Sequence, residues 1–132
     1  MHMRNTIYAL AFIALSTILP GCSCVARDSE TYRKDTRSLV ETRNQAIKEC
    51  YDVALATDAN VSGDVVVTFN VEKKTGKIID PKVDSGRTTA PESLGQCIVE
   101  AIDGLELDPV DQREGQATMA WTFRANPPKP AS

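Results

Sequence analysis

The sequence predicts a small α+β domain in the order α-β-β-α-β, with two helices packed on one face of a three-stranded antiparallel sheet. Two segments carry apolar residues at helical spacing, and three further segments have the alternation or composition of strands. Turn-rich stretches separate these segments, and the length of 132 residues corresponds to one domain. The formal net charge is -3 and no basic stripe is present, so the composition does not favour nucleic-acid binding.

Residues 1–21 predict a bacterial lipoprotein signal peptide. Arg4 supplies a positive start, and the apolar run over 7–19 is too short for a membrane-spanning helix. The tetrapeptide LPGC resembles a lipobox, which implies cleavage between Gly21 and Cys22 and a diacylglyceryl group on the Cys22 thiol. An ordinary secretory signal with a coincidental cysteine and an uncleaved short anchor remain as alternatives.

The predicted lipid attaches the protein to a membrane of the bacterial cell envelope, facing the periplasm. Ser23 follows the lipidated cysteine, and by the sorting rule of enteric bacteria this residue predicts the outer membrane. Cleavage removes His2, the only histidine. The mature chain would therefore have neither a nucleophile activated by histidine nor a metal site with histidine ligands.

The mature chain divides into three predicted parts. Residues 22–37 are polar and lack periodicity, which predicts a flexible tether. Residues 38–125 form the predicted domain, and 126–132 form a proline-rich tail.

The first predicted helix starts at Ser38, which has Glu41 at capping-box spacing, and ends near Ala56. Its apolar residues at helical spacing are Val40, Ile47, Cys50, Ala54 and Leu55. Two strands follow: the first alternates over 65–71, and a hairpin loop over 73–76 leads to the second, from Ile79 to Val83. Pro81 predicts a kink, a bulge or an outward-facing N–H in the second strand.

The second predicted helix begins after Thr89, with Glu92 at capping-box spacing, and stops at Gly104. Its apolar stripe is Leu94, Cys97, Ile98, Ala101 and Ile102. The last strand alternates inward Met119, Trp121 and Phe123 with outward Thr118, Ala120 and Thr122.

Cys50 and Cys97 lie on the apolar faces of the two predicted helices. Because these helices should pack side by side and the signal peptide leads to an oxidising compartment, we expect a disulfide between the two cysteines. Two buried free thiols are the alternative. Three roles remain open for Cys24: a second acylation site, an intermolecular disulfide in a dimer, or a free thiol without a function. Two cysteines without histidine are too few for a zinc site, and no metal is expected.

An ordered set of short motifs runs through residues 45–124. They are Cys50-Tyr51, Gly63 with the first strand, Gly76-Lys77-Ile78, Val83-Asp84-Ser85-Gly86, Cys97-Ile98 with Ala101, Leu105-Glu106-Leu107-Asp108-Pro109, and the aromatic strand through Phe123. The set resembles the C-terminal domain of the TonB superfamily, nearest the two-cysteine AgmX/PglI type of myxobacterial and related proteins. The stretch 105–109 departs from a Trp-x-Phe-Pro stretch frequent in that family.

The resemblance implies that the last strand, Gln116 to Arg124, recruits a partner peptide, with Thr118, Ala120 and Thr122 as the outward residues. The expected function is a non-catalytic protein- or peptide-binding module on a lipid anchor, with an accessory role in an envelope or motility apparatus as one form of it. The alternative is a TonB-like energy transducer that retains its N-terminal segment as an anchor.

The sequence does not favour an enzyme. It has no glycine-rich phosphate loop, no nucleophile elbow and no metal triad, so no cofactor and no small-molecule substrate are expected. The spacing of Asp108 and Asp111 is interpreted as that of a solvated loop.

Overall fold

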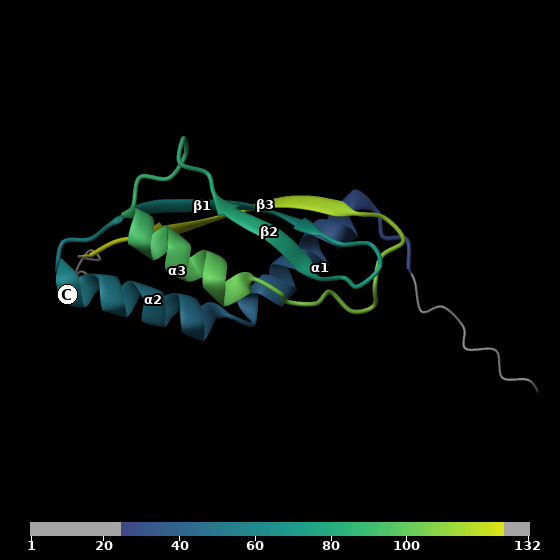
Figure 1. Ribbon diagram of the computed structural model, residues 1–132, viewed down its shortest axis with the longest axis horizontal. Coiled ribbons are helices and arrows are strands. Elements are labelled where there is room, and N and C mark those ends of the chain that lie inside the picture. The colour runs from purple at the N-terminus through teal and green to yellow at the C-terminus, as the bar shows by residue number, and fades with distance from the viewer. Residues whose placement is uncertain (1–24, 126–132) are drawn as a thin grey trace, which may run out of the picture.

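The computed structural model describes residues 25–125. The fold is α+β, as predicted, but it contains one helix more than expected (Figure 1). Its elements are α1 (Ser29–Glu41), α2 (Asn44–Thr57), β1 (Gly63–Val71), β2 (Ile78–Val83), α3 (Glu92–Ile102) and β3 (Gly115–Phe123).

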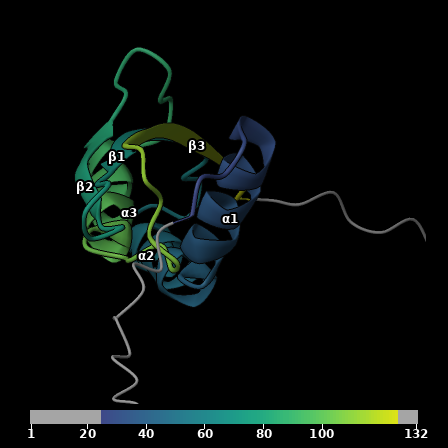
Figure 2. The ribbon, with the colours of Figure 1, turned by 90° about the vertical axis from the view of Figure 1, so that its right-hand side faces the viewer.

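The three strands form one antiparallel sheet in the order β2-β1-β3, with β1 in the centre. The pairing of β1 with β3 is regular from Gly63 opposite Phe123 to Val71 opposite Gly115. Helices α2 and α3 lie side by side below the sheet in Figure 1, and α3 contacts β1 and β2. Figure 2 shows α1 apart from α3, beside β3, which it contacts.

The core lies between the sheet and the helices. Its fully buried side chains include Val65, Val67, Phe69 and Val71 from β1, and Leu94, Ile98 and Ile102 from α3. Each such side chain contributes about 1.5–3 kcal/mol relative to an exposed position. Ile47 and Cys50 of α2 and Val40 of α1 belong to the same cluster, so all three helices share one core.

The predicted flexible tether over 22–37 is wrong for residues 25–37, because most of them belong to α1. Asp28 caps this helix: its Oδ1 accepts a hydrogen bond from the backbone N–H of Thr31 at 2.8 Å. The face turned to the core carries Tyr32, Thr36, Leu39 and Val40, which are spaced i, i+4, i+7 and i+8. Tyrosine and threonine weaken the apolar signal of that stripe, which is why the sequence pattern missed it.

Both predicted capping boxes are also wrong. Ser38 lies inside α1. The helix is interrupted between α1 and α2 at Thr42, whose hydroxyl donates to Leu39 O at 2.6 Å. Thr89 does not cap α3; its Oγ1 accepts from the N–H of Asp64 in β1 at 2.8 Å.

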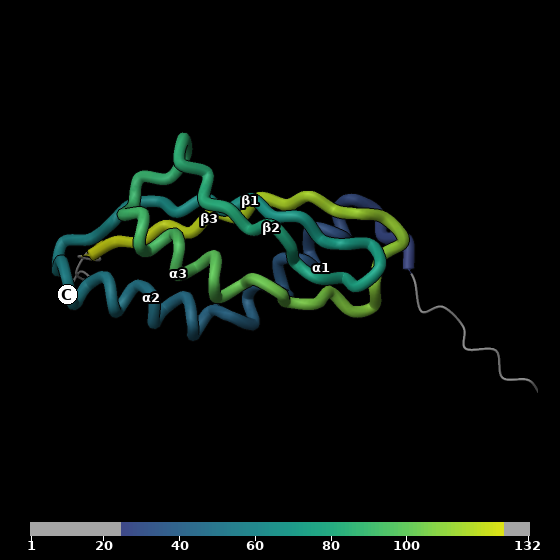
Figure 3. Tube along the Cα trace, viewed as in Figure 1, coloured from purple at the N-terminus to yellow at the C-terminus, as the bar shows by residue number. Residues whose placement is uncertain are grey.

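The predicted turns and the irregularity in β2 are confirmed. Gly76 ends the hairpin with φ +70°, and Gly104 follows α3 with φ +74°, both conformations that favour glycine. In β2, Asp80 and Pro81 together face Phe69 of β1, which is a β-bulge, and Asp80 has φ +51°. The tube in Figure 3 shows that the described chain begins and ends at opposite ends of the long axis.

Candidate peptide-binding edge and groove

The free edge of β3 can be located from the hydrogen bonds on the other side of β1. The N–H of Val66 donates to Thr88 Oγ1 at 3.0 Å, and Val66 O accepts from the N–H of Asp84 at 2.8 Å. The backbone of Val66 therefore points away from β3. Ala120 stands opposite Val66, so its own N–H and C=O point away from β1, toward the outer edge of the sheet.

The backbone hydrogen bonds of Asp64 place a second residue at that edge. The backbone N–H of Asp64 donates to Thr89 Oγ1, and its backbone C=O accepts from the N–H of Ala90 at 3.1 Å. The N–H and C=O of Thr122, its partner in β3, therefore also point outward. Because the register has no irregularity, every second residue of β3 shares this orientation. The outward backbone groups belong to Gln116, Thr118, Ala120 and Thr122. Within residues 25–125, β3 pairs only with β1.

Side chains along β3 alternate as the sequence predicts. Thr118, Ala120 and Thr122 are exposed, whereas Met119, Trp121 and Phe123 are half-buried against the core. Thr122 donates from Oγ1 to Asp64 Oδ1 at 2.7 Å, which holds its side chain over β1. The exposed side chains of Thr118 and Ala120 are small enough for another backbone to approach.

A groove of about 440 Å³ lies between α1 and the first half of β3. Arg33 and Arg37 line it from α1, and Gln116 and Thr118 line it from the edge strand. At one end of the groove the ring of Tyr32 packs directly against the Cα of Gly115, where any larger residue would collide with the ring. This contact sets the separation of α1 from β3.

A buried ion pair holds the segment before α1 in place. Asp111 accepts from the N–H of Arg27 at 2.9 Å and from the N–H of Arg113 at 3.0 Å, and its Oδ2 lies 3.5 Å from Arg27 Nη1. Burial raises the pKa of Asp111, but these N–H donors and the guanidinium charges outweigh it and hold the pKa below its ordinary value. The interpretation of Asp111 as part of a solvated loop is wrong, since its side chain is only 1% exposed.

Further contacts strengthen this attachment, among them a hydrogen bond from Arg113 Nη2 to Arg27 O. Val25 donates to Val110 O at 3.0 Å and accepts from the N–H of Gln112 at 2.8 Å, which forms a short parallel bridge. Arg27 also donates from Nε to Asp35 Oδ2 at 2.7 Å. The chain is therefore fixed to the domain from Val25 onward.

Three buried polar atoms around the groove have no hydrogen-bond partner in the described part of the chain. They are Arg27 Nη1, Tyr32 Oη and Thr36 Oγ1. All three residues line the groove. Burial raises the pKa of the Tyr32 hydroxyl, so this group keeps its proton at neutral pH. Sequence reasoning missed these residues because α1 itself was not predicted.

The predicted disulfide between Cys50 and Cys97 is confirmed, with a Cα–Cα distance of 5.8 Å. It joins α2 to α3 below the sheet, so it supports the strands without contributing to the edge or the groove.

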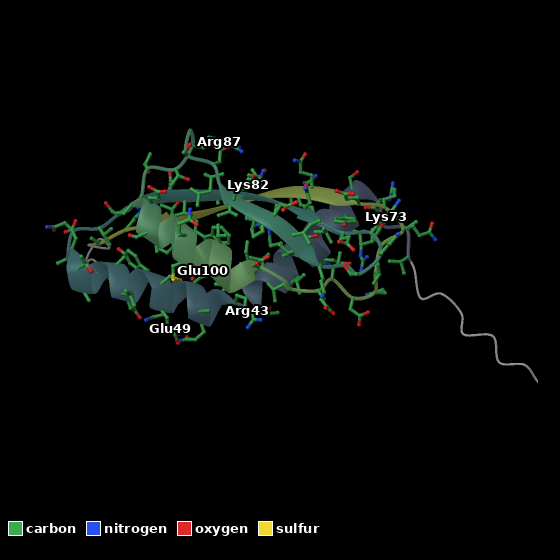
Figure 4. All side chains as sticks on the ribbon, in the orientation of Figure 1. Arg43, Glu49, Lys73, Lys82, Arg87 and Glu100 are labelled. Atoms are coloured by element: carbon green, nitrogen blue, oxygen red, sulfur yellow. A yellow bond between two sulfur atoms is a disulfide. The ribbon has the colours of Figure 1, made fainter. Side chains whose placement is uncertain are left out.

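Other site types find no support in residues 25–125. This part of the chain has no group of three or more acidic, cysteine or histidine residues placed to hold a metal ion. None of its helices is long and apolar enough to cross a membrane. Figure 4 shows the labelled cations Arg43, Lys73, Lys82 and Arg87 spread over different parts of the surface. The predicted cleavage and lipidation residues, Gly21 and Cys22, lie outside the described residues, as does the tail over 126–132.

Comparison of the chain with protein-family models, with curated proteins and with solved structures gives no match.

Proposed function

We propose that this protein is a lipid-anchored, periplasm-facing module that binds an extended segment of a protein partner by strand addition to β3. The observation that carries the proposal is the row of outward backbone groups on Gln116, Thr118, Ala120 and Thr122. An open edge of this kind accepts a peptide through main-chain hydrogen bonds. The proposal agrees with the resemblance to the TonB C-terminal domain and its AgmX/PglI branch, and an accessory role in an envelope or motility apparatus is the form we favour.

Strand addition can be tested with one substitution at the centre of the edge. Ala120→Pro removes an outward N–H that is not part of the β1–β3 ladder, so binding should be lost while the fold remains. Ala120→Thr is the matched control, because threonine keeps the N–H and suits a strand. Peptides selected from a display library on the full chain provide the ligands.

The readout is binding affinity together with amide hydrogen exchange. A bound strand should slow exchange at Gln116, Thr118, Ala120 and Thr122 and leave the bulged edge of β2 unchanged. Selected peptides that bind Ala120→Pro as tightly as the unchanged protein would overturn strand addition, provided that circular dichroism shows both variants folded.

The lipid anchor is the second part of the proposal. Only Ser23 and Cys24 separate Cys22 from Val25, the first residue that the structure describes, whose backbone is hydrogen-bonded to the domain. Three residues span at most about 10 Å, so a lipid on Cys22 would hold the Val25 end of the domain close to the membrane surface. Intact mass spectrometry of the membrane fraction tests this: the expected mass starts at Cys22 and includes acyl groups.

The energy-transducer alternative requires a retained N-terminal segment and a long reach from the membrane. The folding of residues 25–37 into the domain leaves less chain for that reach, so we place this function second. A mass that retains residues 1–21 would contradict the lipid anchor and favour the transducer.

A further inference from the structure

We propose that the groove between α1 and β3 binds a carboxylate, so that β3 selects extended peptides carrying an acidic side chain near its Gln116 end. This inference rests on strand addition to β3 and specifies the class of peptide that is added. The groove lies beside the first half of β3, where Gln116 and Thr118 turn their backbone groups outward. Alternate side chains of an added strand would point toward α1 at that place.

Buried polar side-chain atoms at the groove lack hydrogen-bond partners in the described part of the chain. Thr36 is 2% exposed and Tyr32 Oη is buried as well, yet Thr36 Oγ1 and Tyr32 Oη have no hydrogen-bond partner among the described residues. Arg27 Nη1 also makes no hydrogen bond there, but it already lies 3.5 Å from Asp111 Oδ2. Buried polar groups are normally paired, and leaving them unpaired is costly. The Thr36 and Tyr32 hydroxyls can each donate a hydrogen bond. A ligand with acceptor oxygens would pair them.

The charge along the groove favours an acidic ligand. Arg33 and Arg37 are exposed and line the groove, and neither has a carboxylate within ion-pair distance in residues 25–125. Glu114 is the only acidic residue of the described chain that lines it. Asp35 and Asp111 are already paired with Arg27.

The groove is therefore positively charged at its rim on a chain whose net charge is -3. An arginine guanidinium binds a carboxylate through two parallel N–H donors, which adds geometric selectivity to the attraction of opposite charges. Charge and unpaired donors thus point to the same ligand group.

The test compares matched peptides on the full-length chain in detergent micelles. The probe is a short acetylated and amidated peptide of alternating valine and serine, in which one serine is replaced by glutamate or, as the isosteric control, by glutamine. Binding is measured by fluorescence anisotropy. One charge-assisted hydrogen-bonded pair predicts about tenfold tighter binding of the glutamate peptide, with a smaller difference at high salt.

The variants separate the groove from the edge. The double substitution Arg33→Gln with Arg37→Gln should abolish the preference for glutamate, so that the two peptides bind this variant equally. Lys34→Gln with Arg43→Gln removes the same charge from exposed positions that do not line the groove, and should retain the preference.

Each outcome bears on a different statement. Equal affinity of the two peptides for the unchanged protein would overturn the acidic selectivity and leave strand addition standing. If neither peptide binds, both strand addition and the selectivity are overturned for these sequences. A third peptide, without glutamate but with a free C-terminal carboxylate, tests the other source of the same group. If it binds more tightly than the glutamate peptide, the groove recognises chain ends and the side-chain proposal is wrong.

Discussion

The two edges of the sheet differ in how they meet solvent. The β2 edge is six residues long and carries the bulge at Asp80 and Pro81. Beyond β2, the turn after Val83 takes up the remaining backbone groups of β1 through Asp84, Thr88 and Thr89. The β3 edge is nine residues long, has regular register, and leaves alternate N–H and C=O groups without a strand partner in the described chain.

Natural sheets usually protect their edges with bulges, proline, charges or covering segments. The β2 edge combines a bulge, Pro81 and the exposed Lys82. On the β3 side the neighbouring element is α1, which contacts the strand but leaves a groove beside it. The contrast indicates that the fold blocks further pairing at β2 and keeps it available at β3.

The largest expected effect concerns the support beneath both edges. Replacing Cys50 and Cys97 with alanine removes a crosslink between residues 47 positions apart. For a loop of that length the chain-entropy relation gives about 4 kcal/mol of lost stability. Denaturant unfolding measures the loss, and hydrogen exchange should accelerate at β2 and β3 alike. Acceleration at one edge alone would show that the disulfide supports only that side of the sheet.

The second effect should differ between the β2 and β3 edges. Asp111→Ala leaves the buried Arg27 with only Asp35 as a partner and removes the acceptor for two backbone N–H groups. Breaking a buried pair in this way costs roughly 3 kcal/mol. Because Asp111 fixes the segment that leads into α1, exchange should accelerate in α1 and β3 more than in β2. Uniform acceleration would contradict a local role.

The same residue predicts a dependence on pH. The pKa of Asp111 is lowered in the folded protein, so its stabilising contribution is present above the ordinary value of 3.8 and is lost as the pH falls through the folded pKa. The stability difference between the unchanged protein and Asp111→Ala should therefore shrink in acid. Asp28 and Asp84 also have lowered pKa values, but they are present in both proteins and cancel in the difference.

The strands and the groove also differ in how far the sequence could predict them. The strands, the end of α3 and the disulfide rest on local signals: alternation, Gly104, and cysteines on apolar helix faces. The groove depends on α1, whose stripe mixes Tyr32 and Thr36 with aliphatic residues. It also depends on Asp111, which pairs with Arg27 at a separation of 84 residues. Contacts that distant leave no periodic signal in the sequence.

The smallest effect compares one substitution at the two edges. Asp80 has φ +51°, a conformation that aspartate tolerates and that β-branched residues strongly disfavour. Asp80→Val should therefore cost about 1–2 kcal/mol. Thr118→Val, at an exposed position of regular β3, should change stability by less than about 0.5 kcal/mol, because both residues are β-branched.

Asp80→Asn is the control for this pair of variants. Asparagine adopts positive φ as readily as aspartate, so the control should match the unchanged protein in thermal unfolding and isolate the backbone conformation from the lost charge. If Asp80→Val and Thr118→Val were equally stable, the bulge would adapt to any side chain, and the irregular β2 edge would be as open to pairing as β3. A loss of stability confined to Asp80→Val would instead mean that the β2 edge requires the positive φ of Asp80. The bulged backbone would then be what protects this edge from further strand pairing.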